Sequence, residues 1–277
     1  MPVGRKQQLL PTPVKQVALE NTIEVLQPKF LKKSLQSPYP TFPQGEKEQA
    51  ANFSQTLENL HLDFIVVVAY GKIIPKYRGA SPVQECLKNG DTETWLTTMY
   101  MSERMDEGNI LQIAKIDIDI VDKSPDIFQK FVDIGPELLR DTLQKIQSWE
   151  LQGTPQNYSE ASYCSKIEKE DGKISFQTQT ASQIYNLFRA YTPWPGIYTL
   201  YEGKRLVMEE IQWWSFDWKQ DDIEAWKFLK LWKNCYGILC SDWNILEIKQ
   251  VKPEGKKSMD ITSFVNGNKA VLEYIFE

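Results

Sequence analysis

Blocks of apolar and polar residues along the first 150 positions predict an α/β fold. The run 64–69 is continuously apolar, which is typical of a parallel strand covered on both faces. A short helix at 14–21, a strand at 23–26 and a polar helix at 46–60 are expected before it. The opening segment 2–13 is rich in turn residues and is expected to hold no regular element.

Beyond position 80 the pattern predicts a helix, a pair of strands and a long helix. The first helix is expected over 81–89, with Pro82 in its first turn and Gly90 at its end. Strands are predicted at 94–100 and 108–120. Ser124 is the expected N-cap of the long helix, whose apolar stripe runs to Trp149 and which has an expected kink at Gly135-Pro136.

The last third of the chain has a different pattern. Residues 153–175 are polar and interrupted by turns, and a helix follows at 181–190. Short alternating segments are then separated by turns, at 198–201, 206–213, 237–240 and 245–251. Such spacing is typical of a small β-barrel. We therefore expect three parts: an α/β domain over 1–152, a linker with a helix over 153–195, and a barrel over 196–277.

Composition narrows the class of protein. The 277 residues are 42% hydrophobic and 25% charged, which are globular values, and no apolar run is long enough to span a bilayer. Four scattered cysteines without ligand spacing predict reduced thiols, no metal site and a cytoplasmic location. We expect a monomer with no membrane association.

Charge is unevenly distributed along the chain. The net charge is −5, yet residues 1–33 and 249–257 are locally basic. Two such patches are suited to phosphate groups, and they are equally compatible with ordinary solvated lysines.

Nine short stretches, all in the same order, resemble methionyl-tRNA formyltransferases. They are 2–6, 11–15, 66–71, 77–82, 90–94, 105–108, 166–172, 193–195 and 253–259. The resemblance implies a Rossmann-like formyltransferase domain with a parallel sheet, followed by a small OB-like β-barrel that helps to hold initiator tRNA. It also implies transfer of a formyl group from 10-formyltetrahydrofolate to the amine of methionyl-tRNA in translation initiation, without a metal.

The resemblance also implies roles for individual residues. Asp106 matches the catalytic aspartate of the family; read without the resemblance, it is a carboxylate in a turn before a strand. Arg5, Lys6, Lys256 and Lys257 match basic loops that contact tRNA. The residues that match the folate site are Val68, Ala69, Tyr70, Gly71, Ile74 and Pro75. The pair Ile74-Pro75 matches two different places in the family pattern, and both assignments remain open.

Two departures from the family pattern affect the predicted chemistry. In the family, an Asn-x-His-x-Ser segment lies between the stretches that match 66–71 and 77–82. This chain has no counterpart of that segment between Gly71 and Tyr77, and its single histidine, His61, precedes the apolar strand. We expect His61 to be structural. The family's first strand also has no counterpart, so an incomplete parallel sheet is expected. These departures leave open an inactive tRNA-binding remnant or a truncated gene product. A separate alternative is a related enzyme that formylates an amino-sugar nucleotide.

Overall fold

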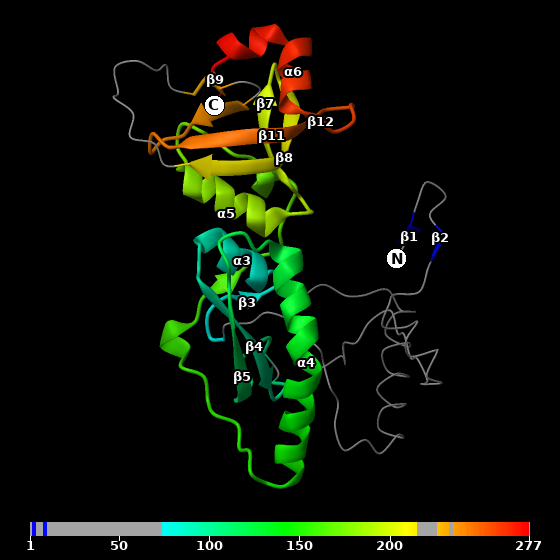
Figure 1. Ribbon diagram of the computed structural model, residues 1–277. Helices are drawn as coiled ribbons and strands as arrows, with labels where there is room; N and C mark the ends of the chain where they lie inside the picture. Colours follow the sequence, from blue (N-terminus) through cyan, green and yellow to red (C-terminus); the bar gives the residue numbers. More distant parts are fainter. Residues whose placement is uncertain are drawn as a thin grey trace, which may run out of the picture. The chain divides into compact units, whose positions relative to one another are not determined.

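The computed structural model describes residues 2–3, 8–9, 74–102, 104–214, 226–232 and 235–276 (Figure 1). The chain divides into two units, Met1–Val68 and Ala69–Glu277. The elements predicted at 14–21, 23–26, 46–60 and 64–69 lie outside the described residues.

The first unit contains a short antiparallel pair of strands. Strand β1 (Pro2–Val3) pairs with β2 (Gln8–Leu9), with Pro2 opposite Leu9. The expectation that 2–13 holds no regular element was therefore wrong. A proline at the first position of a strand is tolerated, so Pro2 does not exclude strand pairing.

The second unit begins with β3 (Arg78–Gly79) and the helix α3 (Pro82–Asn89). Proline occupies the first turn of α3, where its missing N–H costs no helical hydrogen bond. Gly90 ends the helix with φ +74°, and its N–H donates to the carbonyl oxygen of Leu87 at 3.0 Å. The helix and both of its predicted boundary residues are confirmed.

An antiparallel hairpin follows, covered by the longest helix of the described chain. Strand β4 (Glu93–Met99) pairs with β5 (Ile110–Asp117), which ends earlier than predicted, and α4 (Ser124–Gln147) follows. Ile127 and Phe131 are fully buried, as the apolar stripe predicted. The stripe does not extend to Trp149, which lies beyond the helix and is 89% exposed.

The predicted N-cap of α4 was wrong. Lys123 occupies the cap position, and its N–H donates to the carboxylate of Asp126 at 2.8 Å. Ser124 lies in the first turn instead, and its hydroxyl donates to the carbonyl oxygen of Ala190 at 2.5 Å. The serine is thus used for a contact between two helices that are far apart in sequence.

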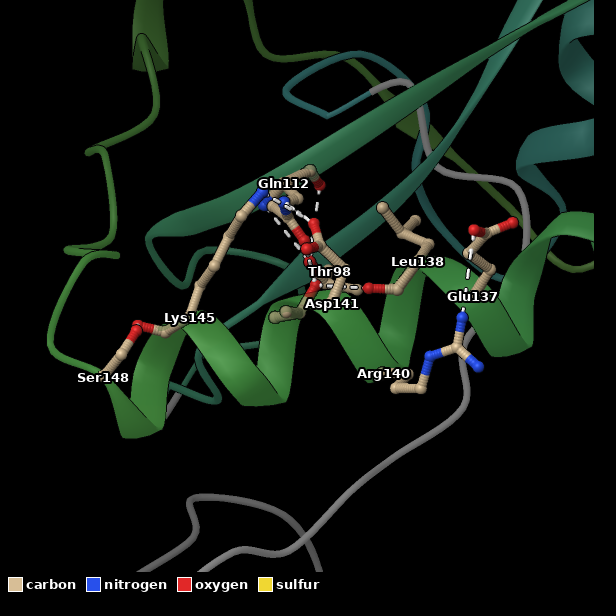
Figure 2. Close-up of polar contacts among 9 residues, drawn as sticks. Thr98, Gln112, Glu137, Leu138, Arg140, Asp141, Lys145 and Ser148 are labelled. Carbon is tan, nitrogen blue, oxygen red and sulfur yellow. Dashed lines mark hydrogen bonds and ion pairs between the residues drawn. The ribbon is translucent and has the colours of Figure 1, made fainter.

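A chain of polar side chains joins α4 to the hairpin (Figure 2). The hydroxyl oxygens of Thr98 and Thr142 are 3.1 Å apart, and the Thr142 hydroxyl donates to Oε1 of Gln112 at 2.5 Å. Gln112 Nε2 donates to Oδ2 of Asp141 at 2.7 Å, and Lys145 Nζ donates to the same oxygen at 2.7 Å. Thr142 is 2% exposed, whereas Asp141 and Lys145 are 44% and 40% exposed, so the network joins the helix to the hairpin from a buried hydroxyl out to the surface.

The connection from α4 to the last helix carries short elements. They are η1 (Tyr158–Glu160), β6 (Tyr163–Cys164) and η2 (Glu170–Gly172), followed by α5 (Ala181–Tyr191). Strand β6 pairs in parallel with β3, the one parallel strand pair in the described part of the chain. Helix α5 contacts α3 as well as β7 and β8 of the C-terminal sheet.

The C-terminal part is an antiparallel sheet with the strand order β7-β8-β11-β10-β9. Its strands are β7 (Ile197–Tyr201), β8 (Lys204–Trp214), β9 (Phe228–Trp232), β10 (Cys235–Leu239), β11 (Ile245–Pro253) and the short β12 (Met259–Asp260), which pairs with β11. Helix α6 (Ile261–Gly267) and η4 (Lys269–Glu273) follow. The α/β class is thus confirmed, with its partial parallel sheet and antiparallel C-terminal strands. Closure into an OB-like barrel stays a prediction.

Within the described residues, no helix is both long enough and apolar enough to cross a membrane.

Candidate active site around Asp106

Asp106 lies in a turn within the loop that joins β4, which ends at Met99, to β5, which begins at Ile110. Its side chain is buried, and its Oδ2 accepts a hydrogen bond from the N–H of Gly79 at 2.9 Å. Its backbone adopts φ +64°, a left-handed conformation that aspartate and asparagine tolerate better than most residues. The turn therefore fixes a buried carboxylate in one orientation.

The same turn needs glycine at position 108. A Cβ there would lie 1.7 Å from the carbonyl oxygen of Tyr100. This is a steric clash, so any other residue would require the backbone to move. The Tyr100 N–H donates to the carbonyl oxygen of Asn109 at 2.9 Å, closing the turn. Close packing of backbone on backbone explains the Asp-x-Gly spacing that the sequence carries.

Gln156 holds the turn from the other side. Its side chain is 6% exposed, and its amide nitrogen donates to the carbonyl oxygens of Asp106 and Gly108 at 2.9 Å and 2.7 Å. Its Oε1 accepts from Nη2 of Arg78 at 2.6 Å. Both ends of the amide are thus engaged, so its orientation is fixed by its partners.

Arg78 is the buried cation of this site. It is 1% exposed, and its Nη1 lies 3.5 Å from Oε1 of Glu107. The guanidinium carbon lies 4.9 Å from the ring centroid of Tyr158 and 5.9 Å from that of Tyr163. Arg78 Nε has no hydrogen-bond partner in the described residues. Carboxylate, amide and aromatic faces together surround a charge that would otherwise be costly to bury.

Gly79 brings the backbone of β3 close to β6. It has φ +128°, and a Cβ at this position would lie 2.1 Å from the carbonyl oxygen of Cys164. The N–H of Ser81 donates to Sγ of Cys164 at 3.4 Å. This close approach leaves the N–H of Gly79 directed at Asp106, which links the stretch 77–82 to the turn.

A shallow hollow of about 200 Å³ lies beside Pro75. Its lining residues are Pro75, Lys76, Asp91, Thr92, Glu93, Trp95 and Glu160. Nearby, the Tyr77 hydroxyl donates to Oδ2 of Asp91 at 2.9 Å, and burial together with this bond raises the pKa of Tyr77 to about 12. Tyr77 is therefore protonated at neutral pH and serves as a donor.

The remaining predicted site residues fall into three groups. Ile74 is buried and Pro75 is partly exposed, both just before β3. Lys256 and Lys257 are exposed in the turn between β11 and β12. Arg5, Lys6, Val68, Ala69, Tyr70, Gly71 and His61 lie outside the described residues. No group of three histidine, cysteine, aspartate or glutamate side chains suited to a metal occurs in the described part of the chain.

Sequence reasoning missed Arg78, Gln156, Tyr158 and Tyr163. The stretch 77–82 was singled out, but an arginine in a loop gives no sign of burial. The other three fall in the polar stretch 153–175. A possible signal was the single glutamine among turn residues in the Thr-Pro-Gln-Asn run before Tyr158.

Comparisons with known proteins cover nearly the whole chain. Residues 73–143 match the family model described as "Formyl transferase", and residues 166–269 match "Formyl transferase, C-terminal domain". A methionyl-tRNA formyltransferase of Sulfurimonas denitrificans is 34% identical over 97% of this chain and 85% of its own length. One from Caldicellulosiruptor saccharolyticus is 35% identical over 97% of this chain and 86% of its own length.

A solved structure shares the fold. The N-formyltransferase of Helicobacter canadensis, in complex with folinic acid and dTDP-3-aminofucose, superposes with a TM-score of 0.50. It is 21% identical and covers 63% of this chain and 62% of its own.

Proposed function

Because this chain belongs to the methionyl-tRNA formyltransferase family, we propose that it transfers a formyl group from 10-formyltetrahydrofolate to the α-amine of methionyl-tRNA. The reaction is an acyl transfer. The amine nitrogen attacks the formyl carbon, an oxyanion develops on the formyl oxygen, and the bond from that carbon to the folate nitrogen breaks. One proton passes from the amine to the departing nitrogen.

We assign to Asp106 the role of accepting this proton from the amine. A carboxylate held in a single orientation can accept the amine proton directly or through a neighbouring group, a contribution typically worth about 10²- to 10⁴-fold in rate. The Gly79 N–H fixes one of its oxygens, and Gln156 fixes the backbone on which it stands. This restrained, buried carboxylate is the observation that supports the proposal.

The formyl donor and the tRNA follow from the family. From the family resemblance we assign the donor to Val68, Ala69, Tyr70, Gly71, Ile74 and Pro75, and the tRNA to Arg5, Lys6, Lys256 and Lys257. A folate ligand in the Helicobacter structure supports the choice of donor class. We do not assign the sugar nucleotide of that structure to this chain, because the relatives that match 97% of the chain are methionyl-tRNA formyltransferases. A translation enzyme of this kind acts in the cytoplasm.

The test is formyl transfer by the purified 277-residue chain. Turnover with 10-formyltetrahydrofolate and charged initiator tRNA supports the proposal. Asp106→Asn should then lower kcat/KM about 10²- to 10⁴-fold. Asparagine tolerates the left-handed backbone and keeps an oxygen for Gly79, so the variant separates charge from fold.

A second candidate is a non-catalytic tRNA-binding relative. The sequence has one histidine and lacks the Asn-x-His-x-Ser segment, so the imidazole and amide that would stabilise the oxyanion are missing from that position. Loss of one such donor costs about 10²- to 10³-fold in rate. This candidate predicts tRNA binding with formyl transfer at the buffer background, and the same assay decides between the two.

A further inference from the structure

Two exposed tyrosines stand beside the Asp106 turn. Tyr158 is 58% exposed and Tyr163 is 69% exposed, although both rings contact the buried guanidinium of Arg78. The Tyr158 hydroxyl donates to the carbonyl oxygen of Glu107 at 3.4 Å, and the Tyr163 hydroxyl accepts from Arg78 Nη1 at 3.3 Å. The rings are therefore held from within while much of their surface faces solvent.

The neighbouring surface combines apolar and basic groups. Met105, directly before Asp106, is 73% exposed. Arg104 is 82% exposed and lies 3.9 Å from a carboxylate oxygen of Glu107. An aromatic face with an exposed cation nearby is a combination that binds single-stranded nucleic acid, the ring contacting a base and the cation a phosphate.

The proposed reaction requires such a ligand at this place. The methionine amine can reach Asp106 only if the 3′-terminal nucleotide that carries it lies within a few ångströms. The 3′ end of a tRNA is unpaired, so its bases have free faces. Stacking of a base on an aromatic side chain strengthens binding by about 5- to 150-fold, as measured by alanine substitution.

We propose that Tyr158, supported by Tyr163, is a stacking platform for an unpaired base at the 3′ end of the tRNA. This assignment rests on the proposed function, because it takes tRNA as the substrate. It adds a binding role that is separate from proton transfer and from the lysines of the C-terminal sheet. Arg78 then has a second use, since its charge orients both rings from beneath.

The experiment follows base stacking directly. Initiator tRNA carrying 2-aminopurine in place of the terminal adenine is titrated with the full chain, because stacking on a tyrosine quenches 2-aminopurine fluorescence. The wild-type chain should quench the probe. Tyr158→Leu, which keeps an apolar side chain without a ring, should lose the quenching and weaken binding about tenfold. Tyr158→Phe keeps the ring and should match the wild type within twofold.

Two controls complete the design. Trp149→Ala removes another exposed aromatic side chain, beyond the end of α4, and should leave quenching and affinity unchanged. Binding of tetrahydrofolate, measured by calorimetry, should be the same for Tyr158→Leu and the wild type. Circular dichroism checks that each variant is folded, and Tyr163→Leu provides an independent test of the same platform.

The possible outcomes distinguish a failure of the stacking platform from a failure of the proposed function. Quenching that survives in both Tyr158→Leu and Tyr163→Leu overturns the platform while tRNA binding stands. A loss of folate affinity with unchanged quenching assigns the rings to the pterin and also overturns it. Absence of any tRNA binding by the wild-type chain overturns the proposed function itself.

Discussion

At the scale of single residues, the amide of Gln156 is the feature on which the geometry of the site depends. It donates to two carbonyl oxygens of the Asp106 turn and accepts from Arg78. A backbone acceptor that is buried and loses its donor costs roughly 1–3 kcal/mol. The turn is therefore stable only while this side chain carries both a donor and an acceptor.

Gln156→Glu tests this requirement with almost no change of shape. The variant keeps an oxygen for Arg78 but replaces the donor by a second oxygen facing two carbonyls. We expect the free energy of unfolding to fall by about 2–4 kcal/mol, as two buried acceptors lose their partner. Urea denaturation measures it. Gln144→Glu, exposed on α4, makes the same chemical change and should stay within about 0.5 kcal/mol. Equal effects in the two variants would contradict the role of Gln156.

The family resemblance singled out Asp106 but not the residues that contact it, and the reason for the second is physical. Asp106 was recognised because the stretch 105–108 matches a short motif of the family. Gln156 lies in a polar stretch and is buried because carbonyl oxygens from a distant part of the chain need a donor. The local pattern of apolar and polar residues does not indicate this burial. Ser124 failed as a predicted cap for a similar reason: its hydroxyl donates to α5.

At the scale of elements, the fit of α4 on the β4–β5 hairpin positions the turn between those strands. The hairpin is joined to α4 by the partly buried network that runs from Thr98 through Thr142 and Gln112 to Asp141. Thr142→Val keeps the volume and removes the hydroxyl. We expect a loss of about 1–3 kcal/mol in the free energy of unfolding, because Oε1 of Gln112 loses its donor. Thermal and urea unfolding report it, with the exposed Thr178→Val as control. If Thr142→Val leaves the free energy of unfolding unchanged, the network adds no stability.

The acidic end of this network predicts a pH dependence. Hydrogen bonds from Gln112, and then from Lys145, lower the pKa of Asp141 below its ordinary value. A carboxylate with a lowered folded-state pKa stabilises the fold above its unfolded pKa, near 4, and loses this contribution as the pH falls through the folded value. Asp141→Asn should therefore be less stable than the wild type at pH 7, and the gap should narrow by pH 2.5. Urea unfolding at both pH values measures this difference in stability. A difference that is the same at pH 7 and pH 2.5 would contradict a stabilising role of the Asp141 carboxylate.

Element types followed from the sequence more readily than their limits. Helices α3 and α5 were predicted nearly to the residue, and for α3 the local signals were Pro82 in the first turn and Gly90 at the end. Strand β9 was missed, since it is recognisable only by its pairing with β10. The β4–β5 hairpin was expected as two strands, but their antiparallel register depends on the turn at Asp106 and Gly108.

At the scale of the whole molecule, an acidic chain has to bind a polyanion through local basic surfaces. The net charge of −5 opposes tRNA, whereas Lys256 and Lys257 are exposed in one turn of the C-terminal sheet. That turn is anchored, because the Arg205 N–H donates to the Glu254 carboxylate at 3.0 Å and the Glu254 N–H donates to the Arg205 carbonyl oxygen at 2.9 Å. Two cations on a fixed turn can contact phosphates at little entropic cost.

The salt dependence of tRNA binding measures this contribution. Each phosphate contact releases counterions, so its loss lowers the slope of log K against log salt by about 1. Lys256→Gln with Lys257→Gln should reduce the slope by about 1–2 and weaken binding most at low salt. Lys88→Gln with Lys115→Gln removes the same charge from lysines already paired with Glu85 and Glu93, and should leave the slope unchanged. If both pairs change the slope equally, the effect is one of net charge, and the turn between β11 and β12 has no specific role in binding tRNA.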